Sequence, residues 1–252
     1  MKGSLLSLAV SALAAAATVA GDTAPGPLEE VTVYGVRGRL YEAGLLKDVI
    51  QKTEVISDET MVKRNAMILT EAIAYSPGVR VNNECSMCGV KRVMLNGLRG
   101  EHTTVLTDGI PTHTMMSGFY GLDAAAAAGL SRVELARGSG ASLIAPEAIG
   151  GSINLVTREA TSNDLDLDIA GGEIGYRKAS AVATAITDSE ATRVTLSGQL
   201  LEREQYDGDD NGVSESPETT HQSLTAYLSQ DVGDSDNLRV RVSRVDSEIF
   251  GG

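Results

Sequence analysis

The feature that most constrains this chain is a change of hydrophobic period after Thr161. From there on, apolar and polar residues alternate over about five runs. A period of two puts the apolar side chains on one face of an extended strand and the polar side chains on the other. Residues 161–252 are therefore expected to form antiparallel strands, each about as long as a strand that crosses a bilayer at a tilt. The alternating apolar positions are Leu165, Leu167, Ile169, Val182, Val194, Leu196, Leu200, Leu224, Ala226, Leu228, Leu238, Val240 and Val242.

The connections between these runs have two lengths. Asp188–Ala191 and Gly233–Asp236 are tight turns, whereas Gln205–Thr220 is long. Short and long connections at opposite ends are typical of outer-membrane barrels, although Gly171–Arg177 is short on the side of the long connection. About five open strands would leave two unpaired edges, so we expect an incomplete barrel in a truncated chain. A soluble β-sandwich, whose strands also alternate, is the alternative.

The N-terminus has the pattern of a secretory signal peptide. After Met1 and Lys2, an apolar run from Leu5 to Ala20 ends in small residues. The run is short for a spanning helix, is mostly Ala and lacks a basic stop-transfer cluster. We expect residues 1–20 to direct export and to be removed.

Helical and strand patterns mix in the region before Thr161. Ser57 and Asp58 are expected to cap a helix that carries Met61, and a second helix around Leu69 is expected to stop at Pro77. About a hundred residues of this kind suffice for one small mixed α/β domain with its own core. The expected strands are Val79–Val81, Arg92–Leu95, Thr104–Thr107, Arg132–Leu135 and Ser152–Val156.

Charge and motifs exclude several classes of function. The net charge of −13 argues against a nucleic-acid partner, because phosphate contacts need clustered basic residues. Many of the acidic residues lie between Glu202 and Glu218, and this segment is predicted to be a solvated loop. Attraction of a cation is the alternative interpretation. His102, His113 and His221 lie far apart, and neither a phosphate-binding loop nor a nucleophile elbow is present. We do not expect an enzyme.

Four motifs together resemble the TonB-dependent outer-membrane receptor family, and they stand in the family's order. They are "LEEVTVYG" (Leu28–Gly35), "TEAIAYSPGVRV" (Thr70–Val81), "LNGLRGEHTTVLTDGIP" (Leu95–Pro111) and "LSRVELARGSGASLIAPEAIGGSINLVTRE" (Leu130–Glu159). The resemblance implies an extended segment at residues 21–44 with a TonB box at 28–35. It also implies an α+β plug domain at 45–160, followed at 161–252 by the first antiparallel strands of a transmembrane β-barrel.

The resemblance also implies a function, partners and a location. The protein would sit in the cell outer membrane, in contact with lipid, and would import a scarce ligand using energy from TonB and its inner-membrane complex. The alternating β-branched residues of Val31–Val33 can add as an edge strand to a partner sheet, although an ordinary first strand of the plug is the alternative. A soluble periplasmic or secreted binding module remains the other function. The residues expected to contact TonB in the periplasm are Glu29, Glu30, Val31, Thr32, Val33 and Tyr34.

The chain departs from the family pattern at "NNECSMCG", which holds both of its cysteines. By resemblance, this segment and "DGIPTHTMMSGFYG" form plug loops that face the substrate. Thiolate, thioether and imidazole are ligands of soft metals, so Cys85, Met87, Cys88, His113 and Met115 are expected metal ligands, for copper above all. A Cys85–Cys88 disulfide is the alternative in an oxidising envelope, and the methionines can instead pack the loop. No resident cofactor is required, and the cargo is expected to be a metal ion, a copper or iron chelate, or a cobalamin-like compound. The expected substrate-facing residues are Cys85, Ser86, Met87, Cys88, His113, Met115, Met116 and Tyr120.

Overall fold

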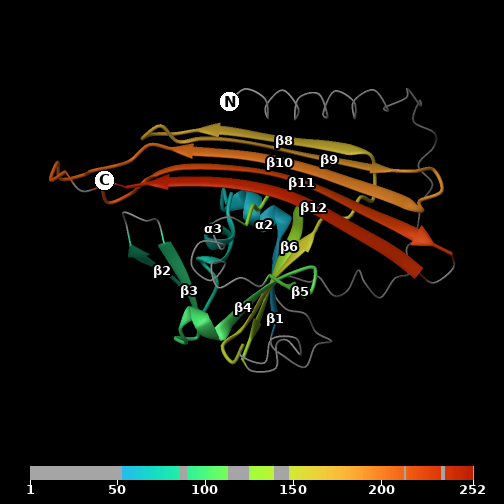
Figure 1. Ribbon diagram of the computed structural model, residues 1–252, viewed down its shortest axis with the longest axis horizontal. Coiled ribbons are helices and arrows are strands. Elements are labelled where there is room, and N and C mark those ends of the chain that lie inside the picture. Colours follow the sequence, from blue (N-terminus) through green and yellow to red (C-terminus); the bar gives the residue numbers. More distant parts are fainter. Residues whose placement is uncertain are drawn as a thin grey trace.

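The chain has two parts, a mixed α/β domain and a long antiparallel sheet that lies across one side of it (Figure 1). The computed structural model describes residues 53–85, 90–112, 125–138, 148–212, 214–233 and 236–251. We call the first part, up to residue 160, the plug and the sheet after it the wall. Within those ranges, no helix is both long enough and apolar enough to cross a membrane.

The plug is built on a five-stranded sheet with the order β1-β6-β7-β4-β5. Neighbouring strands pair antiparallel, except β4 and β7, which run parallel. Two short helices and a separate β2–β3 hairpin complete the domain, with α2 and α3 on the side that faces the wall (Figure 1). The elements are β1 (Thr53–Ser57), α2 (Asp58–Lys63), α3 (Leu69–Ile73), β2 (Val79–Cys85), β3 (Val90–Leu95), the 3-10 turn η2 (Gly100–His102), β4 (Thr103–Thr107), β5 (Ile110–Pro111), β6 (Leu130–Arg137) and β7 (Gly151–Thr157).

Local sequence signals explain where α2 begins. Ser57 caps α2, and its hydroxyl accepts a hydrogen bond from the backbone N–H of Thr60 at 3.3 Å. Asp58 and Glu59 in the first turn also favour this end of the helix dipole. The helices and the sheet share one aliphatic core, so the expected α+β domain is confirmed. The most deeply buried members of this core are Leu69, Ala72, Ile73, Val93, Leu95, Val133, Leu135 and Ile153.

The wall is a meander in which each strand pairs antiparallel with the next. Period-two alternation predicted these strands correctly, and the last two extend further than their apolar runs, to 15 residues each. The loops also follow the expected lengths, with the longest connection between β10 and β11. The strands are β8 (Asp164–Gly171), β9 (Arg177–Ile186), β10 (Thr192–Arg203), β11 (Glu218–Val232) and β12 (Asp236–Phe250).

The two faces of the wall have opposite polarity. Thr195, Ser197 and Gln199 alternate along β10 on the face that contacts the plug, and all three are buried. Most apolar residues of the strands point the other way, so that Ile169 is 80% and Val242 66% exposed, whereas Leu201 packs against the plug. A soluble β-sandwich would bury its apolar faces against each other. The wall does the reverse, which argues against the sandwich interpretation.

Candidate functional site

The centre of the contact between plug and wall is the side chain of Gln199. Its amide Nε2 donates to the carbonyl oxygen of Met67 at 2.7 Å, and its Oε1 accepts from the backbone N–H of Ala128 at 3.2 Å. One wall side chain therefore joins two plug segments that are themselves bonded, since Ala127 N donates to Met67 O at 2.9 Å. An amide suits this position because it can donate and accept at once.

Next to this contact, the backbone of the plug comes very close to the wall at Gly129. Its φ of +80° favours glycine, and a Cβ placed there would lie 2.5 Å from the Oγ of Ser197. Any side chain at this position would therefore push the plug away from β10. The absence of a side chain at Gly129 therefore allows the plug to contact β10 closely.

Charged contacts hold the linker between plug and wall. Arg158 is hydrogen-bonded to Asp58 of α2 at 2.9 Å and also to Asp166 of β8. Burial alone would lower the pKa of the Arg158 guanidinium, but its hydrogen bonds with Asp166 and Asp58 raise that pKa above the ordinary value. The adjacent Glu159 accepts a hydrogen bond from Ser229 at 3.0 Å and lies 3.6 Å from Arg193. These contacts tie the start of the wall to the first helix of the plug.

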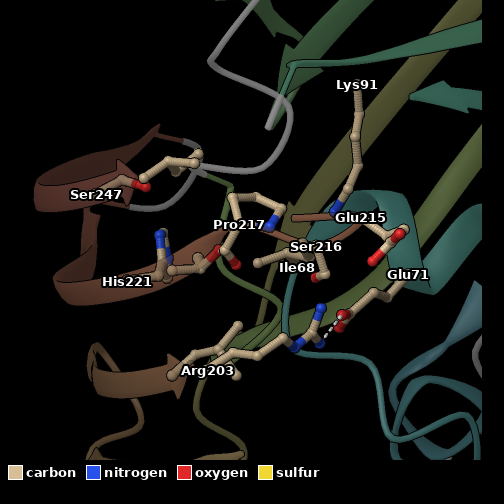
Figure 2. Close-up of a pocket in the computed structure, with 12 residues that line it drawn as sticks. Ile68, Glu71, Lys91, Arg203, Glu215, Ser216, Pro217, His221 and Ser247 are labelled. Carbon is tan, nitrogen blue, oxygen red and sulfur yellow. Dashed lines mark hydrogen bonds and ion pairs between the residues drawn. The ribbon is translucent and has the colours of Figure 1, made fainter. Parts of the chain in front are cut away.

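A cavity of about 80 Å³ lies between the plug and the wall, beside the β10–β11 connection (Figure 2). Arg203 Nη2 lies 3.7 Å from Glu71 Oε1 across it, and its guanidinium carbon stands 5.6 Å from the centre of the Tyr176 ring. His221 is 1% exposed. The lining combines Ile68, Glu71 and Lys91 of the plug with Leu201, Arg203, Thr219, His221, Ser247 and Ile249 of the wall strands and Glu215, Ser216 and Pro217 of the connection.

Most of the residues expected to contact substrate or TonB lie outside the described residues. This holds for the TonB-box segment 28–35 with Glu29, Glu30, Val31, Thr32, Val33 and Tyr34, and for Ser86, Met87, Cys88, His113, Met115, Met116 and Tyr120. Of Cys85 only the backbone is described, at the end of β2 opposite Val90. The disulfide and the soft-metal site therefore stay predictions. Lys91, next to Val90, lines the cavity, so the end of this hairpin comes close to it.

The acidic β10–β11 connection is more ordered than a simple solvated loop. Oxygen atoms of Asp207, Asp209 and Glu215 lie within 4.8 Å of one another. Asp207 accepts backbone hydrogen bonds from Asn211 at 3.2 Å and from Gly212 at 2.8 Å, and the bond from Gly212 is the largest cause of its lowered pKa. Such oxygens are the ligands of hard cations. The sequence also indicates a cation-binding loop here, because residues 207–218 follow the D-x-D-x-N-G-x₅-E spacing of calcium-binding loops.

Comparison with known proteins agrees with this architecture. Residues 46–152 match the family model of the TonB-dependent receptor plug domain. Over these residues the chain is similar to the plug domain of TonB-dependent receptors. It is 26% identical over 196 residues to the vitamin B12 transporter BtuB of Photobacterium profundum, covering 75% of this chain and 31% of that protein. BtuB of Vibrio cholerae O395 is likewise 26% identical over 198 residues, covering 78% and 32%.

Solved receptors share the fold. The ferric-catecholate import receptor Fiu of E. coli K12 superposes with a TM-score of 0.63 at 16% identity, covering 80% of this chain and 28% of that one. The pyoverdine receptor FpvA of Pseudomonas aeruginosa PAO1, bound to pyoverdine, gives 0.63 at 17% identity and covers 80% and 29%. The chain spans about a third of the length of the curated relatives it matches. At this identity the structural likeness establishes the fold.

Proposed function

We propose that the full-length protein is an outer-membrane receptor that binds a scarce substrate at its plug loops and imports it into the periplasm with energy supplied through TonB. The observation that carries this proposal is the polarity of the wall. Its polar face meets the plug while its apolar face is exposed. A lipid bilayer is the solvent that such an apolar face requires, because in water a broad exposed apolar face is unfavourable.

The substrate is a metal ion, a metal chelate or a cobalamin-like compound. Relatives named as vitamin B12 transporters and structural neighbours named as a ferric-catecholate import receptor and a pyoverdine receptor support this range. Within it, the soft ligands Cys85, Met87, Cys88, His113 and Met115 favour copper, as the ion or as a chelate. If Cys85 and Cys88 instead form a disulfide, they fix the end of the β2–β3 hairpin, and an organic or chelated substrate is favoured.

Energy coupling is assigned to the segment Glu29–Tyr34. Its β-branched residues suit addition to a partner sheet through backbone hydrogen bonds. Proline at Val31 would remove one N–H donor and fix φ, whereas isoleucine there would keep the β-branched strand character. V31P and V31I therefore form a matched pair that separates backbone pairing from the bulk of the side chain.

The test uses the full-length gene in a strain that lacks it. Uptake of cyanocobalamin, ferric siderophore and copper is measured for wild type, V31P and V31I, together with the amount of receptor in outer-membrane fractions. We expect one substrate to be imported by wild type and V31I and lost in V31P at equal receptor levels. Equal uptake in all three would refute TonB capture at this segment. Recovery of the protein in the soluble periplasmic fraction would instead favour a binding module.

A further inference from the structure

Segments far apart in the sequence bring charged side chains to the cavity between plug and wall. Arg203 reaches it from β10, Lys91 from β3 and Glu71 from α3 (Figure 2). The β10–β11 connection adds Glu215. The balance between these cations and carboxylates decides which ligands the cavity favours.

Both carboxylates already accept hydrogen bonds from the backbone. Glu71 Oε2 accepts from Met67 N at 2.9 Å, and Glu215 Oε2 accepts from Gly208 N at 2.7 Å. The other oxygen of Glu71 lies 3.7 Å from Arg203, beyond the roughly 2.7–3.2 Å of a good N–H···O hydrogen bond. Glu71 therefore stays near Arg203 without closing a strong hydrogen bond to it, so an anion that approaches more closely can compete.

Arg203 has a second contact that helps to hold it beside the cavity. The carbon of its guanidinium lies over the ring of Tyr176, 5.6 Å from the ring centre, within the range of a cation–π interaction. A guanidinium presents parallel N–H donors that match a carboxylate or a phosphate. At about 80 Å³ the cavity accommodates one small anionic group rather than a whole chelate.

Resting on the receptor function proposed above, we propose that Arg203 and Lys91 bind an anionic group of the imported substrate, a carboxylate or a phosphate, and that this group displaces Glu71 from Arg203. Glu71 belongs to the plug and Arg203 to the wall. Occupation of the cavity therefore removes one ionic contact between the two parts. Substrate recognition and a weaker hold on the plug follow from the same exchange.

The experiment is calorimetric titration of the purified full-length receptor in detergent, with citrate as the carboxylate probe and inorganic phosphate as the phosphate probe. Wild type, R203Q and E71Q are compared with R177Q, which removes an exposed arginine of β9 that does not line the cavity. We expect one probe to bind wild type and R177Q alike and R203Q about tenfold or more weakly, because charge-assisted hydrogen bonds are lost. E71Q should bind severalfold more tightly, since the competing charge is gone.

The opposite responses of R203Q and E71Q separate ligand binding from a structural role, because simple loss of the ion pair would affect both variants in the same direction. Failure of both probes to bind wild type, or equal affinity in wild type and R203Q, would overturn the inference. If this happened while V31P still abolished uptake, the receptor function would stand without this anion site. If V31P had no effect either, the proposed function would fail independently.

Discussion

Replacing Gln199 by alanine should loosen the plug from the wall at one defined place. The change removes the bonds to Met67 O and Ala128 N from a residue that is 5% exposed. Met67 O keeps its bond from Ala127 N, so losing the second donor there costs about 0.5–1.5 kcal/mol. The N–H of Ala128 has no such substitute in the variant, and an unsatisfied buried donor costs about 1–3 kcal/mol. Together the two contributions give about 1.5–4.5 kcal/mol.

Hydrogen exchange on the full-length receptor measures this effect. The amide of Ala127 is the informative probe, because its own acceptor survives in Q199A and faster exchange there reports opening of the segment. Even about 1.5 kcal/mol corresponds to about 12-fold faster exchange. The matched control is Q222A, which removes an exposed glutamine of the neighbouring strand. Unchanged protection of Ala127 in Q199A would refute the idea that this amide docks the plug.

G129A should shift the plug from the wall and lower its protection from exchange, because φ of +80° is strained for alanine and its Cβ would meet a wall serine at 2.5 Å. Since the folded-state pKa of Asp207 is lowered, its stabilisation of the acidic loop should be present above its unfolded pKa of about 3.9 and lost as pH falls through the lower folded value. The NMR chemical shift of the Gly212 amide should follow this loss, and D207N, which has no carboxyl group to titrate at this position, should lack this pH dependence. Combining C85S with H113A in the full-length receptor should lower copper accumulation if these side chains hold the metal, and unchanged accumulation would rule them out as the metal site.

The strands of the wall were predictable because their side chains face two different environments. The alternation of apolar and polar residues follows from these two environments. It places Thr195, Ser197 and Gln199 on one face of β10, and in the structure this face meets the plug. Strand β1 was not predicted. Its five residues have little apolar pattern of their own and become a strand by pairing with β6, about 80 residues later. Long-range pairing of this kind leaves little trace in a local sequence.

The cavity could not be predicted from the sequence for a related reason. Glu71 and Arg203 have no sequence relation to each other, and only the docking of α3 against β10 makes them neighbours. The spacing of the acidic residues, by contrast, is present in the sequence from Asp207 to Glu218, within a segment whose acidity already allowed cation attraction. A ligand set within one loop can be read from spacing, whereas a site shared by plug and wall requires the fold.

The way the plug is attached bears on how it could move. Its aliphatic core is made of plug residues alone, and the apolar cluster shared with the wall is small, consisting of Met67, Ile68 and Leu201 with Tyr176 packed against it. The remaining contacts described above are hydrogen bonds and ion pairs to polar wall residues, which water can replace at a net cost of about 0.5–1.5 kcal/mol each. Displacing the plug therefore breaks its contacts with the wall but leaves its own core intact. A pull on the N-terminal segment could shift such a domain without first unfolding it, and an anion that takes Arg203 from Glu71 would remove one of the contacts resisting that pull.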